Sequence, residues 1–134
     1  YKLKNIIAFK IFEHIFEKES LINSISKSLK KKGKLVLFVP FMYRYHGDPN
    51  DFYRFTHSYL KKFLEKNGFK VEITLIGAGQ MNVILEIILK YLKFNILKII
   101  FSPIFILFNQ IFNLVSKDFK NYYCGIHCSC IKIK

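Results

Sequence analysis

The segment between residues 41 and 56 gathers side chains that can move protons and hold charged groups. In a short stretch it contains an imidazole, two carboxylates and two guanidinium groups: His46, Asp48 and Asp51, and Arg44 and Arg54. Histidine ionises near neutral pH, so His46 is the best candidate for a base that takes a proton from a hydroxyl. The carboxylates could orient that imidazole or bind substrate hydroxyls, and Arg54 could hold an anionic group bidentately. A structural alternative stays open, in which Asp51 only pairs with Arg54 and Pro49 only sets a turn.

A second chemically distinctive string, Phe12-Glu13-His14-Ile15, follows a short apolar run at 5–9. The loop that holds His46 follows another apolar run, at 35–40. Both runs have the length of buried strands. Ligands of open α/β sheets bind beyond the carboxyl ends of strands, so both segments are expected at one binding edge.

Alternating strands and helices are predicted around these segments. Glu13 is one of three acidic residues expected at the start of a helix that ends at Lys30–Lys32, with Gly33 as its left-handed C-cap. Thr56 is expected to cap a second helix that closes at Asn67-Gly68, and residues 69–76 alternate like a strand. This order favours an α/β layer with parallel strands and right-handed crossovers.

Residues 81–117 form a hydrophobic segment without any charge between 99 and 115. Ser102-Pro103 predicts a break between two helices, with Ser102 as N-cap and Pro103 at the first helical position. The polar stripe expected on the first helix is Asn82, Glu86, Lys90 and Lys93. The second helix is expected to carry Phe105, Phe108 and Phe112, with a polar side of Asn109 and Asn113.

Three interpretations of this segment stay open. It could be a helical hairpin that covers the sheet or a dimer partner, or an amphipathic hairpin in a membrane interface with its lysines toward anionic headgroups. A transmembrane span is less favoured, because the uncharged run of 17 residues is short and contains Pro103. We expect a helical insertion at 81–117 between a first part at 1–80 and a closing strand within 118–134.

The composition narrows the class of protein. A hydrophobic fraction of 51% among 134 residues excludes a disordered chain and fits one core. The net charge of +13 suggests an anionic membrane surface as partner, or a lysine-rich composition of the whole proteome. Nucleic acid is less favoured, because the lysine clusters are expected at helix ends and solvent faces. Three cysteines give no disulfide framework, so we expect a reducing, cytoplasmic location.

No metal site is predicted from the cysteines. Cys124, Cys128 and Cys130 point to one face of an extended strand and His127 to the other, and one strand cannot surround a tetrahedral ion. Buried free thiols are the favoured interpretation.

Several strings, taken in order, resemble the C-terminal half of a class I S-adenosylmethionine-dependent methyltransferase, a Rossmann-like α/β fold. The resemblance covers residues 3–79 and, more weakly, 121–134. The first strings are Ile6-Ile7-Ala8, Phe12-Glu13-His14-Ile15, Leu29-Lys30, Gly33-Lys34-Leu35-Val36-Leu37 and Val39-Pro40-Phe41. The later ones, similar to a bacterial subgroup (the type 11-like methyltransferases), are His46, Asp48-Pro49, Asp51, Arg54-Phe55-Thr56, Leu64 and Gly68-Phe69.

The resemblance implies S-adenosylmethionine as cofactor, bound near Phe9, Lys10 and His14. It implies His46, Asp48, Asp51 and Arg54 on the side of the methyl acceptor, which the subgroup suggests is a hydroxyl of a sugar or lipid-linked saccharide. Asn5 and Lys10 depart from the family's pattern, because an acid usually opens this strand and a small or polar residue stands next to the cofactor's methionine.

Two expectations follow about activity and location. No glycine-rich cofactor loop precedes Tyr1, and Gly77-Ala78-Gly79 is interpreted as a turn, so the isolated chain is expected to be inactive. The protein is expected in the cytoplasm or at the inner face of the cytoplasmic membrane. The alternative is a non-catalytic basic membrane-surface or interaction module derived from a decayed methyltransferase.

Overall fold

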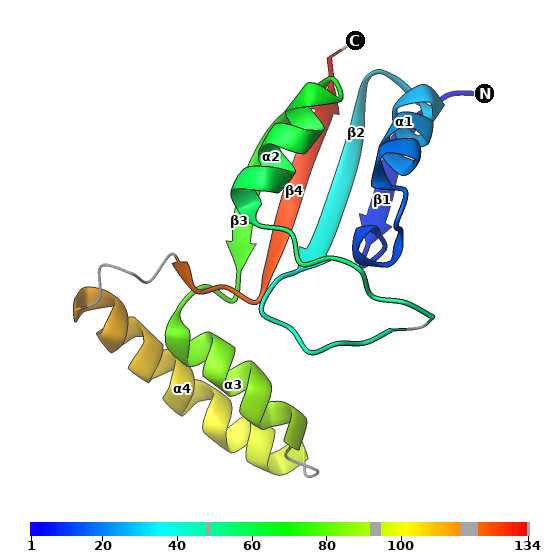
Figure 1. Ribbon diagram of the computed structural model, residues 1–134. Helices are drawn as coiled ribbons and strands as arrows, with labels where there is room; N and C mark the ends of the chain where they lie inside the picture. The colour runs from blue at the N-terminus through cyan, green and yellow to red at the C-terminus, as the bar shows by residue number, and fades with distance from the viewer. Residues whose placement is uncertain (48, 92–94, 116–120, 134) are drawn as a thin grey trace. The chain divides into compact units, whose positions relative to one another are not determined.

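A computed structural model describes residues 1–47, 49–91, 95–115 and 121–133 (Figure 1). The chain divides into two compact units: Tyr1–Thr74 with Gly125–Lys134, which we call the sheet unit, and Leu75–Cys124, which we call the hairpin unit. The elements in chain order are β1 (Leu3–Phe9), the 3-10 turn η1 (Phe12–His14), α1 (Lys18–Ser28), β2 (Leu29–Pro40), α2 (His57–Lys66), β3 (Phe69–Ile76), α3 (Gln80–Tyr91), α4 (Asn95–Val115) and β4 (Gly125–Lys132).

The four strands form one sheet in the order β1-β2-β4-β3. β1 and β2 are parallel, and β2 and β4 are antiparallel. In Figure 1, β1, β2 and β3 run in one direction, and β4 runs in the other between β2 and β3. The predicted α/β class and the closing strand are therefore confirmed.

The core of the sheet is apolar because β2 and β4 turn matching residues to one face. Leu35, Leu37 and Val39 are fully buried, and their partners across the sheet are also buried: Cys130, Cys128 and Ile126. Such apolar cross-strand pairs stabilise a sheet. The thiols of Cys128 and Cys130 are free and buried as predicted, and burial raises the pKa of each to about 12.

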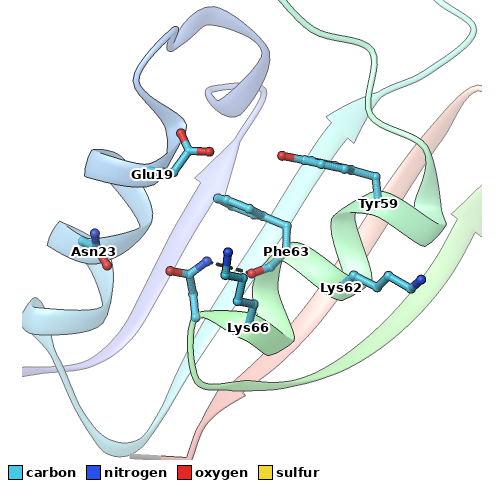
Figure 2. A pocket seen from close by; sticks show the side chains of 7 residues that line it. Glu19, Asn23, Tyr59, Lys62, Phe63 and Lys66 are labelled. Carbon is cyan, nitrogen blue, oxygen red and sulfur yellow. Dashed lines mark hydrogen bonds between the residues drawn. The ribbon is translucent and has the colours of Figure 1, made fainter.

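The helices α1 and α2 lie side by side over the sheet, and a groove of about 440 Å³ runs between them (Figure 2). Phe63 lies in this groove, and residues of both helices line it. Thr56 caps α2 as predicted, since its hydroxyl accepts a hydrogen bond from the Tyr59 N–H at 3.2 Å. The helix also ends as predicted, at Asn67 and a Gly68 with φ of +85°.

The predicted end of the first helix is wrong. α1 stops at Ser28, and the lysine run already belongs to β2. Gly33 does not cap a helix; the left-handed residue is Lys32, with φ of +61°. A Cβ atom at Gly33 would lie 2.8 Å from the Lys30 carbonyl oxygen and 3.1 Å from that of Lys4. The glycine is needed because the Lys30 carbonyl of its own strand leaves no room for a Cβ, and β1 also approaches closely there, at an irregularity in the register.

The hairpin unit consists of α3, α4 and the segments that flank them (Figure 1). The expected break at Ser102-Pro103 is wrong, because α4 continues through Pro103. A proline removes only one helical hydrogen bond, and packing of the apolar residues on both sides of it can offset that loss. α3 ends at Tyr91, and α4 already begins at Asn95.

One polar residue of α4 also differs from its expected position. Asn109 was expected on the polar side of its helix, but it is 7% exposed. Its amide donates a hydrogen bond to the Ala78 carbonyl, which the Asn82 amide also approaches, at 2.7 Å. The inward position satisfies a backbone acceptor, which a sequence pattern cannot indicate. Lys93 lies outside the described residues.

Apolar side chains cover the exposed surface of α4. Leu114 is 88% exposed and Ile99 is 72% exposed. Other apolar residues of this helix that are at least two-fifths exposed are Ile96, Ile100, Phe101, Ile104, Ile106, Leu107, Phe108, Ile111 and Phe112. In the described part of the chain, no helix combines the length and the apolar character needed to cross a membrane.

Candidate active site

The two chemically distinctive segments meet at the carboxyl ends of β1 and β2, as predicted. Each follows one of these parallel neighbouring strands. The loop after β2 returns to η1, because the N–H groups of Phe52 and Tyr53 both donate to the Glu13 carbonyl, at 2.7 and 3.3 Å. This backbone contact fixes the loop against the end of β1.

Glu13 occupies the centre of the site, and the sequence analysis gave it no role there. Its side chain is fully buried together with that of Phe12, because the 3-10 turn directs both inward. Neither carboxylate oxygen has a hydrogen-bond partner among the described residues. Burial raises the pKa of Glu13, and the nearby His14 and His46 oppose this rise. The signal that could have identified it is its position between a buried Phe12 and a candidate histidine.

His14 and His46 approach this carboxylate from two segments. The Nε2 atom of His14 lies 3.8 Å from Glu13 Oε1, and that of His46 lies 3.7 Å from the same oxygen. The two imidazole rings meet edge to face, with centroids 4.9 Å apart. The structure thus brings together two of the predicted residues, one from each segment.

Both imidazoles are held through their Nδ1 atoms. His14 Nδ1 lies 2.5 Å from the Asn50 carbonyl oxygen. His46 Nδ1 lies 3.1 Å from Asp51 Oδ2 and 3.2 Å from the Arg44 carbonyl oxygen. All these partners are acceptors, so they assign the proton of each neutral ring to Nδ1 and leave Nε2 as the free lone pair.

Asp51 holds His46 in place through both the imidazole ring and the backbone. Its side chain is fully buried and also accepts the His46 backbone N–H at 3.0 Å. Hydrogen bonds from Arg54 lower the pKa of Asp51 to about 2, against the opposing effect of burial. The carboxylate is therefore charged at neutral pH and can stabilise a positive charge on the imidazole.

Arg54 is fully engaged by the protein. Its two terminal nitrogens bind both oxygens of Asp51, with Nη2 at 2.5 Å from Oδ2. Its remaining N–H groups donate to three backbone carbonyls, those of Tyr43, Tyr53 and Arg44. With five donors occupied, the side chain clamps the loop, which favours the structural alternative for this residue over direct binding of an anionic substrate.

The remaining predicted residues lie nearby or outside the described part of the chain. Phe9 ends β1, is 59% exposed and stacks on Phe38 with ring centroids 4.8 Å apart. Lys10 follows with φ of +52°, and its ammonium lies 4.9 Å from the centroid of the Tyr43 ring. Asp48 lies outside the described residues.

A groove of about 280 Å³ opens beside Asp51 and Arg54. The other residues that line it are aromatic: Tyr43, Tyr45, Phe52 and Tyr53. Aromatic walls with a few polar groups are typical of small-molecule sites. The larger groove between α1 and α2 is lined by different residues, such as Lys62 and Lys66 (Figure 2).

Comparison with solved structures identifies the fold. A SAM-dependent methyltransferase from Archaeoglobus fulgidus matches 98% of this chain with 16% identity and a TM-score of 0.55. Phosphoethanolamine N-methyltransferase 2 of Haemonchus contortus, in complex with S-adenosyl-L-methionine, matches 98% with 14% identity and a TM-score of 0.52. The [4+2]-cyclase SpnF matches 98% with 13% identity and a TM-score of 0.57. The chain has a class I methyltransferase fold.

The likeness is one of fold. The chain covers 59% of the Archaeoglobus protein, 33% of the Haemonchus enzyme and 50% of SpnF, so it spans between one third and three fifths of the length of these proteins. No protein-family model matches the chain, and no curated protein matches it by sequence. One neighbour is named as a cyclase, which illustrates that this fold does not by itself determine the reaction.

Proposed function

We propose that the protein is an S-adenosylmethionine-dependent methyltransferase that acts on a hydroxyl, such as one of a sugar or lipid-linked saccharide. The observation that carries the proposal is the free Nε2 of His46, held at the carboxyl ends of two parallel strands by a buried, charged Asp51. The methyltransferase fold of the chain supports the choice of cofactor.

The residues at the end of β1 fit the methionine end of this cofactor. The exposed ring of Phe9 offers an aromatic face, which attracts cations such as a sulfonium. An ammonium such as that of Lys10 would repel a sulfonium beside it. In the structure the Lys10 ammonium lies over the Tyr43 ring, whose electron-rich face attracts it. Phe9, Lys10 and His14 would therefore flank the cofactor, which supplies the methyl group as an electrophile.

The chain's own residues would then align the acceptor and receive its proton. His46 Nε2 takes the proton of the attacking hydroxyl, and the imidazolium that forms is stabilised by Asp51 at Nδ1 and by Glu13 near Nε2. Arg54 acts as a positioning residue, because it holds Asp51 in place. The aromatic groove beside Asp51 and Arg54 would hold the acceptor ring.

The test is a set of substitutions in the intact protein, with methyl transfer and cofactor binding measured separately. His46→Ala is expected to lower kcat by about 10²–10⁴-fold, the usual contribution of a general base, while the Kd for S-adenosylmethionine changes little. Asp51→Ala and Arg54→Ala should lower kcat more than cofactor affinity, and Arg54→Lys should not restore it, because lysine cannot form the same fork. His57→Ala, at the start of α2, is the matched control.

Wild-type turnover in all three alanine variants would contradict the assignment of the site. Absence of methyl transfer in the intact wild-type protein, with every acceptor class tried, would instead favour the non-catalytic module as the function.

A second proposal concerns the hairpin unit: we infer that it binds anionic membranes peripherally. The supporting observation is the exposed apolar surface of α4, with Leu114 and Ile99 largely in solvent. Burial of apolar surface at the acyl boundary contributes about 25 cal/mol per Å². Headgroup attraction adds about 1 kcal/mol per nearby lysine, and salt screens this part.

Co-sedimentation with anionic vesicles tests this interpretation. Binding should weaken but persist at high salt, alkaline carbonate should extract the protein, and joint replacement of Phe105, Phe108 and Phe112 by serine should weaken binding further. Absence of binding at low salt would assign the hairpin to packing against protein, and resistance to carbonate would show that it spans the membrane.

A further inference from the structure

At the centre of the site lies a buried carboxylate, that of Glu13, to which no described residue donates a hydrogen bond. Both oxygens of Glu13 are buried and have no hydrogen-bond partner among the described residues. A protonated Glu13 would need an acceptor for its proton, and an ionised Glu13 would need a cation or several donors. The nearest ring nitrogens, those of His14 and His46, lie 3.8 and 3.7 Å away, beyond hydrogen-bond distance.

The two histidines are arranged as metal ligands usually are. Each directs Nε2 toward Glu13 and holds Nδ1 against an oxygen acceptor: the Asn50 carbonyl for His14, and Asp51 with the Arg44 carbonyl for His46. Metal-bound histidines nearly always donate their second N–H to a carboxylate or a backbone carbonyl in this way. The buried Nε2 of His46 also has no hydrogen-bond partner among the described residues.

The spacing of the three side chains fits one ion. One ligand atom each from Glu13, His14 and His46 can be chosen so that all lie within 4.8 Å of one another. Ligands bound at about 2.0–2.2 Å from a common ion are about 3–4.4 Å apart, so small side-chain movements suffice. Two imidazoles and one carboxylate suit a divalent first-row transition ion and leave coordination positions open.

We propose that Glu13, His14 and His46 bind a divalent transition-metal cation at the carboxyl ends of β1 and β2. The sequence predicts no metal, because its cysteines and His127 lie along one strand and no sequence pattern places Glu13 in the site. The cation would neutralise the buried carboxylate and occupy both free ring nitrogens.

The role of this cation rests on the proposed function. With a cation bound, His46 Nε2 is a ligand and no longer the base. The acceptor hydroxyl would instead coordinate the ion at an open position, which lowers the pKa of the hydroxyl so that its proton can leave to solvent. Asp51 then serves as the partner that orients a metal ligand, and Arg54 remains its clamp.

The experiment is a titration of the full chain with Co²⁺ alone, followed by visible absorption and by equilibrium dialysis. We expect one ion per chain with the absorption bands of nitrogen and oxygen ligation, and competition by Zn²⁺. Even partners outside the coordination sphere change metal affinity by about 10–100-fold, so Glu13→Gln, His14→Gln and His46→Gln should each weaken binding by at least about 100-fold. Asp51→Asn should weaken it by about 10–100-fold.

Matched controls are Glu72→Gln on β3 and His57→Gln on α2, which should leave affinity unchanged. Glu13→Gln keeps the shape of the buried side chain, and circular dichroism verifies that each variant is folded. Binding that is equal in the ligand variants and the controls, sulfur-to-cobalt charge-transfer bands, or no binding by the wild-type chain would overturn the proposal.

The metal site and the proposed function fail in different ways. Co²⁺ binding through these residues without any methyl transfer would remove the proposed function and keep the site. Methyl transfer by a wild-type chain that binds no Co²⁺ would remove the metal site and keep the proposed function, with His46 as the base.

Discussion

The two units of this chain place their apolar residues in opposite ways. In the sheet unit, Leu35, Leu37 and Val39 are fully buried between strands and helices, and the lysines lie outside. In the hairpin unit, Leu114 and Ile99 lie mostly in solvent, although α4 is the most apolar helix described. A unit that buries its apolar side chains is stabilised by them, whereas exposed ones contribute mainly when another surface covers them. Equal substitutions should therefore have unequal effects in the two units.

The cysteines offer the largest contrast. Cys128 and Cys130 are buried in the sheet unit with thiol pKa values raised from 9.0 to about 12, while Cys124 is part-exposed in the hairpin unit. This higher pKa lowers the thiolate fraction of Cys128 and Cys130 about 1000-fold at pH 8, so iodoacetamide at that pH should modify Cys124 first. The other two thiols should react only after unfolding. Mass spectrometry of the alkylated chain measures this, with a urea-unfolded sample as control.

The same pKa values predict a loss of stability in alkali. The thiols of Cys128 and Cys130 ionise at lower pH in the unfolded chain than in the folded one. Their contribution to stability is therefore fully present below pH 9 and is lost as the pH rises from 9 toward 12. In the alkylation experiment described above, rapid modification of all three cysteines in the folded protein at pH 8 would contradict the described core.

Leu37→Ala should destabilise the sheet unit by about 2–5 kcal/mol, because it leaves a cavity in a fully buried position. Urea unfolding followed by circular dichroism measures the change. A Leu37→Ile variant, which keeps the volume, should cost less than about 1.5 kcal/mol. A small loss with Leu37→Ala would mean that the sheet is less tightly packed than the structure shows.

Pro103→Ala should stabilise α4 by up to about 3 kcal/mol, since a proline inside a helix lacks one hydrogen bond. The helical signal of the hairpin unit should persist to higher temperature. The control is Ile104→Ala, the neighbouring exposed position, which changes no backbone hydrogen bond. A loss of stability in Pro103→Ala would show that the proline is required where it stands, as the sequence analysis expected for a helix start.

Leu114→Ala should change the stability of the protein in solution by no more than about 0.5 kcal/mol, because the side chain is 88% exposed. The same substitution should weaken binding to anionic vesicles if the exposed surface contacts lipid. Stability measured by urea unfolding and binding measured by co-sedimentation separate the two effects. A cost similar to that of Leu37→Ala would show that Leu114 is covered by protein.

Local signals predicted most of the sheet unit, whereas its tertiary details were hidden. Features that depend on neighbours in sequence could be predicted: the apolar runs, the Thr56 cap and the end of α2 at Asn67-Gly68. Gly33 was misassigned because its role depends on the close approach of another strand. Glu13 was missed for the same reason, since its burial follows from a loop that folds back over it.

In the hairpin unit the sequence located two helices but misplaced the start of the second, which is Asn95. Proline usually predicts a helix start, yet α4 runs through Pro103 because the apolar residues on both sides continue the helix. The inward position of Asn109 was equally hidden, since it depends on a carbonyl far away in sequence.

The place of β4 between β2 and β3 has a consequence for synthesis on the ribosome. Both of its neighbours are translated earlier, so each exposes an unpaired edge until residues 125–132 have left the exit tunnel. Lys132, whose ammonium binds the Ser26 and Leu29 carbonyls at the end of α1, leaves the tunnel after both of these strands. The nascent chain must therefore keep β2 and β3 from aggregating while residues 77–124 are translated, and a stop shortly before Gly125 should yield a product that chaperones and proteases recognise.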